Sequence, residues 1–124
     1  MLKKVLYLFL FLLFPINLFA SEVAIRAIVN GDIITSYDVE QRAKLSHELL
    51  KLNKYTMSDS EIENKVLDEM IDDKIKVAEA SRFGIHITPI ELDEAKKRME
   101  KYLNLPDGGY DKLVKKLDIE PSIV

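Results

Sequence analysis

Four acidic residues crowd two turns of the middle of the chain and are its most concentrated set of possible metal ligands. They are Asp68, Glu69, Asp72 and Asp73. Carboxylate oxygens are the ligands that divalent cations such as Ca²⁺ prefer. The spacing is not that of an EF-hand loop, and Lys65, Lys74 and Lys76 stand among the acids. We therefore interpret the cluster as a solvated helix face and not as a metal site.

The two histidines, His47 and His86, are a second set of residues suited to acid–base or metal chemistry. Neither has another histidine at metal-ligand spacing or a nucleophile as partner. Asp107-Gly108-Gly109 has the glycines of a phosphate-binding loop, but no Lys-Ser/Thr follows it and no strand precedes it. The sequence therefore predicts no catalytic, cofactor-binding or metal-binding residue.

Apolar residues near the end of a predicted helix give a candidate peptide-binding surface. They are Met99, Tyr102, Leu103 and Leu105. Flexible methionine and rigid tyrosine suit surfaces that accept many peptides. Helical apolar stripes are more often core, which is the interpretation we favour, and an open groove for an extended peptide is the alternative.

The composition excludes several classes of protein. A chain of 124 residues is long enough for one small domain. A net charge of −3 with no basic stripe argues against nucleic-acid binding. The chain has no cysteine, which excludes disulfides, thiol nucleophiles, thiolate metal sites and a lipid-modified cysteine.

Residues 1–20 have the layout of a secretory signal peptide. Lys3 and Lys4 precede an apolar run over residues 5–14, and the segment ends at Ala20. We expect cleavage between Ala20 and Ser21. The apolar stretch is interrupted by Pro15 and is shorter than the roughly 20 residues that span a bilayer, which disfavours a membrane anchor.

A short β-ribbon is predicted at the start of the mature chain. Two β-branched runs, residues 23–29 and 33–34, flank Asn30-Gly31. Asn-Gly is a strong hairpin signal because both central residues of a type I′ turn need positive φ. Such a ribbon is marginally stable alone, so we expect it to pack against helices.

A central helix is predicted to organise the domain. Ser58 and Glu61 form a capping box at its start, and Gly84 ends it. Its apolar face carries Ile62, Val66, Leu67, Met70, Ile71, Ile75 and Ala78. Because a single amphipathic helix is not stable in water, we expect other elements to cover this stripe.

Three further helices are predicted around it. One begins at Thr35 or Ser36 and runs to about residue 52. Another begins at Thr88-Pro89 and runs to about residue 103, with an inner face of Leu92, Ala95, Met99, Tyr102 and Leu103. A short helix follows Gly109, and Pro121 opens a further one, so that the domain looks cut. The fold class is mainly α: about four helices with a short N-terminal β-hairpin.

Three stretches and the leader together resemble a known family. The stretches are V-A-I-R-A-I-V-N-G-D-I-I-T-S-Y-D-V, V-L-D-E-M-I-D-D-K-I-K-V-A-E-A and G-I-H-I-T-P-I-E-L-D-E-A. In order and spacing they resemble the N-terminal domain of the SurA family, periplasmic chaperones of Gram-negative bacteria that carry parvulin-type peptidyl-prolyl isomerase domains. The resemblance covers residues 22–120.

The resemblance implies a signal peptide over residues 1–20 and a periplasmic chaperone domain over residues 21–124. It implies ATP-independent binding of unfolded outer-membrane protein segments, with no cofactor and only transient membrane contact through the leader. The family continues with a further helix and parvulin domains, so no isomerase residue can be carried over. Asp118 also stands where the family often has glycine. A non-catalytic fragment of a longer isomerase, or a stand-alone interaction protein, remain alternatives.

Overall fold

The computed structural model describes residues 22–123. The elements within this range are two strands, four α-helices and a 3-10 turn, which confirms the predicted helical fold with a β-hairpin before the helices. The predicted leader and its cleavage site at Ala20 and Ser21 lie outside the described residues. Within residues 22–123 no helix is both long and apolar enough to cross a bilayer.

The β-ribbon forms around the Asn-Gly turn as predicted. β1 (Ile25–Val29) pairs antiparallel with β2 (Asp32–Thr35). Asn30 and Gly31 have φ of 53° and 91°, the positive values that this turn requires. Ile34 of β2 is fully buried against the helices, so the ribbon is held by packing and not by its own pairing alone.

Three helices begin with the same reciprocal cap. They are α2 (Ser36–Leu52), α3 (Asp59–Arg82) and α4 (Pro89–Tyr102), capped by Thr35, Ser58 and Thr88. Each cap hydroxyl accepts a hydrogen bond from the backbone N–H three residues on, and the acid at that position accepts one from the cap's own N–H. The N-cap of α2 is therefore Thr35 and not Ser36.

The main core lies between the ribbon, α2 and the first half of α3. Its buried members are Ile34, Val39, Ala43, Ile62, Val66 and Met70. A smaller core joins α2 to α5 (Gly109–Lys116) and the residues after it, through Leu45, Val114 and Ile119. Because α2 contributes to both cores, it connects the two ends of the domain.

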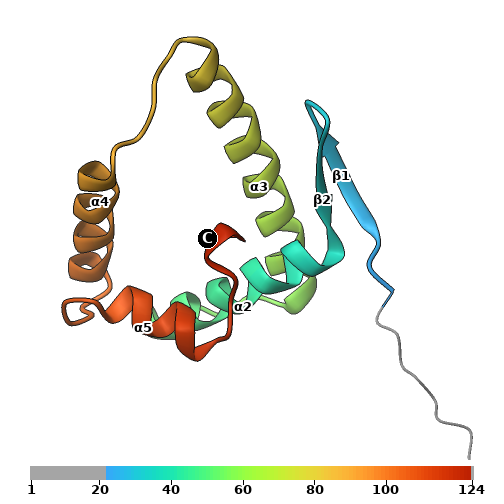
Figure 1. The fold of residues 1–124 in the computed structure, drawn as a ribbon. Helices are drawn as coiled ribbons and strands as arrows, with labels where there is room; N and C mark the ends of the chain where they lie inside the picture. The colour runs from blue at the N-terminus through green and yellow to red at the C-terminus, as the bar shows by residue number, and fades with distance from the viewer. Residues whose placement is uncertain (1–21, 124) are drawn as a thin grey trace, which may run out of the picture.

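The central helix α3 is buried only along its first half. Ile62 is 2% exposed, whereas Ile75, on the same predicted apolar face, is 45% exposed. Figure 1 shows the last turns of α3 rising clear of α2. The prediction that the whole stripe is covered is therefore wrong beyond the first half of the helix.

The chain forms an open frame (Figure 1). α3 and α4 stand on opposite sides, residues 83–88 join them across the top, and α2 and α5 lie along the base. The expected inner face of α4 is largely uncovered: Leu92, Ala95, Met99 and Tyr102 are exposed, and Leu103 is buried. The core interpretation is wrong for these exposed residues because α4 packs mainly on α5.

The segment after α5 turns back into the frame. A 3-10 turn, η1 (Pro121–Ile123), forms where Pro121 predicted the opening of a helix. Ile119 and Ile123 are buried, while the residues between them are exposed. This places the described C-terminal residues inside the frame (Figure 1), against α2.

Candidate functional site

Three of the four clustered acids of α3 pair with basic side chains, and the cluster does not converge on a point. Asp72 pairs with Lys76 and Glu69 with Lys65, each one helical turn away. Asp73 instead reaches Arg42 on α2, with Nη2 2.9 Å from Oδ2. Across residues 22–123 no group of three His, Cys, Asp or Glu side chains could hold a metal ion. The arrangement fits a charged, solvated helix face.

The two histidines lie apart from each other. His47 Nε2 lies 3.5 Å from Asp59 Oδ1, which connects α2 to the start of α3. His86 is exposed on the linker between α3 and α4. Their positions indicate a polar contact at the surface and a linker residue, and not a shared site.

The Asp107-Gly108-Gly109 turn holds a carboxylate of the protein itself. Glu100 of α4 is 5% exposed, and its carboxylate accepts hydrogen bonds from the backbone N–H groups of Gly108 (3.2 Å) and Tyr110 (2.9 Å). Two of the amides that could hold a phosphate are therefore occupied. Sequence reasoning missed Glu100 because an acid on a helix usually faces water.

The predicted peptide-binding residues divide into exposed and buried members. Tyr102 is 78% exposed and Met99 is also exposed. Leu103 is 9% exposed and Leu105 is half-buried, because both lie in the turn that leads to α5. A ligand could therefore reach Met99 and Tyr102, but not Leu103 without rearrangement of this turn.

Exposed apolar side chains continue from these two residues toward α3. We call the whole set the apolar belt. It consists of Val77, Phe83, Ile85, Ile87, Ile90, Leu92, Met99 and Tyr102. The belt residues follow the last turns of α3, the linker and α4, which are the upper part of one side, the top and the opposite side of the frame in Figure 1. Exposed apolar surface of this kind marks binding sites for other polypeptides.

A hollow of about 620 Å³ lies between α4, α5 and the residues after α5. Leu92, Tyr110 and Val114 contribute its apolar lining, and Lys96 Nζ reaches Asp111 Oδ1 across it at 2.7 Å. This hydrogen bond raises the pKa of Lys96, and burial raises the pKa of the Tyr110 phenol. Leu92 connects the hollow to the apolar belt.

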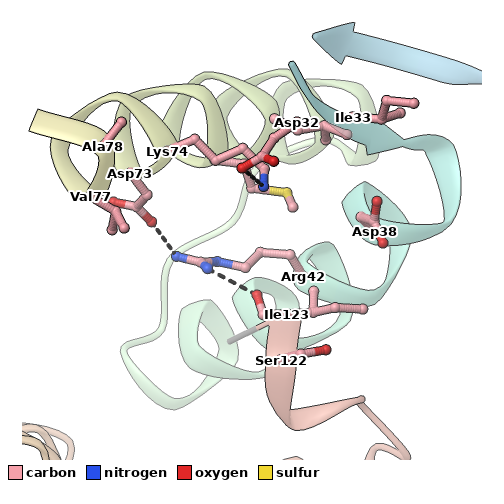
Figure 2. A pocket seen from close by; sticks show the side chains of 12 residues that line it. Asp32, Ile33, Asp38, Arg42, Asp73, Lys74, Val77, Ala78, Ser122 and Ile123 are labelled. Carbon is pink, nitrogen blue, oxygen red and sulfur yellow. Dashed lines mark hydrogen bonds and ion pairs between the residues drawn. The ribbon is translucent and has the colours of Figure 1, made fainter. Parts of the chain in front are cut away.

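A groove of about 460 Å³ lies between β2, α2, the second half of α3 and η1 (Figure 2). We call it the Arg42 groove. Ile34 and Met70 contribute its buried floor. Two ion pairs form its rim: Arg42 with Asp73, and Lys74 Nζ with Asp32 Oδ2 at 3.3 Å. Sequence reasoning missed this groove because these pairs join residues 31 and 42 positions apart.

Comparison with known proteins decides the family. The family model of the SurA N-terminal domain matches residues 23–117, which is most of the chain. The chain belongs to the SurA N-terminal domain family. The SurA N-terminal domain therefore includes the ribbon, all four α-helices up to the end of α5, and the apolar belt.

Two curated relatives carry the same family name. Each is called Chaperone SurA, one from Bordetella pertussis and one from Bordetella bronchiseptica, and each is 33% identical to this chain over 72 residues. The matched segment is 57% of this chain but 14% of each relative. No solved structure gives a significant match. The domain described here therefore belongs to a family of chaperones.

Proposed function

We propose that this chain is a periplasmic chaperone module that binds unfolded segments of outer-membrane proteins without ATP. The apolar belt is the observation that carries the proposal. A small domain has little apolar surface to spare, so eight large apolar side chains left in water on consecutive segments of the chain are costly unless they bind something. Membership of the SurA N-terminal domain family supports the same function.

The chemistry of the belt suits an unfolded β-barrel chain. Strands of outer-membrane barrels alternate apolar and polar residues, so an extended segment offers an apolar side chain at every second position. Met99 and Tyr102 of the predicted peptide surface belong to the belt, and Leu103 does not. Burial of apolar area needs no fixed sequence, which allows many clients, and it needs no nucleotide.

Aggregation of an unfolded outer-membrane protein tests the proposal. The purified protein, at several-fold molar excess, is expected to lower the light scattering that follows dilution of the client from urea. The triple variant Phe83→Ser, Ile87→Ser, Tyr102→Ser is expected to lose most of this effect, because it removes three of the most exposed belt residues.

A matched triple variant controls for the number of changes. Glu94→Ser, Lys97→Ser and Lys101→Ser alter exposed polar residues of α4 and are expected to leave the effect intact. If the wild-type protein does not reduce scattering, the chaperone proposal is refuted. A stand-alone interaction protein would then fit the belt better.

A further inference from the structure

We propose that the Arg42 groove binds an unfolded polypeptide through one aliphatic side chain and one backbone carbonyl, and that Ile123 of this chain takes this position at one end of the groove as an internal ligand. This proposal deepens the proposed function. The external ligand is taken to be an unfolded client segment, and this identification rests on the proposed function. The groove is separate from the apolar belt except for Val77, which contributes to both.

The internal ligand shows what the groove recognises. The Ile123 side chain is 9% exposed and lies among the groove residues, and its backbone carbonyl accepts a hydrogen bond from Arg42 Nη1 at 2.9 Å (Figure 2). The other terminal nitrogen of the guanidinium, Nη2, donates a hydrogen bond to Asp73 Oδ2 at 2.9 Å. Because Asp73 orients Arg42, one nitrogen points at the place where a ligand carbonyl would lie.

Ile119 packs in the smaller core, but the contacts of the residues after it are not specific for their sequence. Glu120, Pro121 and Ser122 are exposed, and the Ser122 hydroxyl bonds to Glu120 within the segment. What enters the groove is an aliphatic side chain and a peptide carbonyl, and any extended polypeptide offers both. With Ile123 in this position, about 460 Å³ of the groove is still open, which is in the range of ligand sites. An unfolded client segment could therefore replace the internal one.

Tethering explains why Ile123 holds the Arg42 end of the groove in the resting protein. A segment joined to α5 by a few residues competes at an effective concentration on the order of millimolar. A peptide added in solution must displace it, so its apparent affinity is reduced by the fraction of molecules in which the groove is open. Release of the segment should then increase the affinity for an external peptide.

Fluorescence anisotropy with a labelled peptide of residues 117–123, acetylated and amidated, tests this competition. The Ile123→Ser protein is expected to bind the peptide at least about fivefold more tightly than wild type, because its groove is open more often. Adding Arg42→Gln to that variant is expected to weaken binding at least about fivefold, since the carbonyl loses a charged donor. Ile28→Ser, on β1, and Arg98→Gln, on α4, are matched controls at exposed sites outside the groove and the belt, and we expect them to change nothing.

Equal affinities of the wild-type and Ile123→Ser proteins, with both shown to be folded by circular dichroism, would overturn the proposal. So would unchanged binding after Arg42→Gln in the Ile123→Ser protein. A second measurement needs no variant. Excess unlabelled peptide added to ¹⁵N-labelled wild type is expected to shift the amide resonances of Ala78 and Ile123, and no shift at millimolar peptide would also overturn it.

The light-scattering assay separates this proposal from the chaperone function. Peptide binding in the groove with no effect on aggregation would support the Arg42 groove and refute the chaperone role. Suppression of aggregation without any peptide binding in the Ile123→Ser protein would support the chaperone role and refute the groove.

Discussion

The Glu100 carboxylate on α4 accepts a hydrogen bond from the backbone N–H of Tyr110 on α5, at 2.9 Å. The residue at the N-cap of α5 is Gly108, which has no side chain to cap the helix. Glu100 supplies the missing acceptor from the neighbouring helix and places a negative charge at the positive end of α5. One buried carboxylate therefore holds two helices of the frame together.

Replacement of this carboxylate should loosen the α4–α5 corner. We expect Glu100→Ala to lower the free energy of unfolding by about 1–3 kcal/mol, because it leaves two part-buried amides without an acceptor. Urea unfolding measures the change. Glu94→Ala, at an exposed site on the same helix, is the control and is expected to cost about 0.5 kcal/mol or less. Equal losses in the two variants would refute the capping role.

Two isoleucines of α3 test the uneven burial of this helix. Ile62→Ala is expected to destabilise the protein by about 2–4 kcal/mol, because Ile62 lies in the main core. Ile75→Ala makes the same chemical change at a site that is about half exposed, and we expect a loss below about 1 kcal/mol. Thermal unfolding of both variants compares them. A similar loss at the two positions would mean that the second half of α3 is covered in solution.

The capping boxes should make stability depend on pH. Hydrogen bonds from Ser58 lower the pKa of Glu61, first through its side chain, and those from Thr88 lower the pKa of Glu91, first through its backbone N–H. A carboxyl whose pKa is lowered in the folded state stabilises the fold at pH values above its unfolded pKa of about 4.3. This contribution is lost as the pH falls through the folded-state pKa.

Glutamine at both positions removes this titration and keeps an acceptor for each cap. We expect the wild-type protein to be more stable than Glu61→Gln/Glu91→Gln near neutral pH, and the difference to shrink at about pH 3. Urea unfolding across this range measures the difference. A difference that stays constant or grows on acidification would contradict the assignment.

The turn after α2 stores local strain at a lysine. Lys54 has φ of 58°, and the turn is closed by bonds from Lys54 N–H to the Lys51 carbonyl (3.1 Å) and from Tyr55 N–H to the Leu50 carbonyl (3.0 Å). We expect Lys54→Gly to stabilise the protein by about 0.5–1 kcal/mol, because glycine adopts this conformation without a steric cost. Lys51→Gly, inside α2, is expected to destabilise by a similar amount. A lower free energy of unfolding in Lys54→Gly would contradict the interpretation that the backbone is strained at Lys54.

Local signals in the sequence were sufficient to place the elements. Asn30-Gly31 and the Thr88–Glu91 capping box each act within a few residues, so neither depends on the rest of the fold. The same local reasoning missed the left-handed residues Lys54 and Asp118, because a positive φ is expected at glycine and not at these types. Asp118 adopts this conformation, with φ of 53°, directly after α5.

Burial and the sites could be predicted less well, because both depend on which elements meet. Ile75 and Met99 lie on apolar helical stripes, and periodicity alone cannot show that the partner elements end before reaching them. Arg42 and Asp73 lie on two separate helices, and only the fold brings their side chains within 2.9 Å. The apolar belt and the Arg42 groove can therefore be identified only from the tertiary structure.

Mapping of the client-binding surface by NMR tests the central claim most directly. The ¹⁵N-labelled protein is titrated with a peptide from an outer-membrane β-strand whose aromatic and aliphatic residues alternate. We expect the amide shifts to concentrate between residues 83 and 102, where seven of the belt residues lie. Shifts confined to the ribbon and the main core, or none at concentrations that suppress client aggregation, would contradict the proposal that the apolar belt binds unfolded chains.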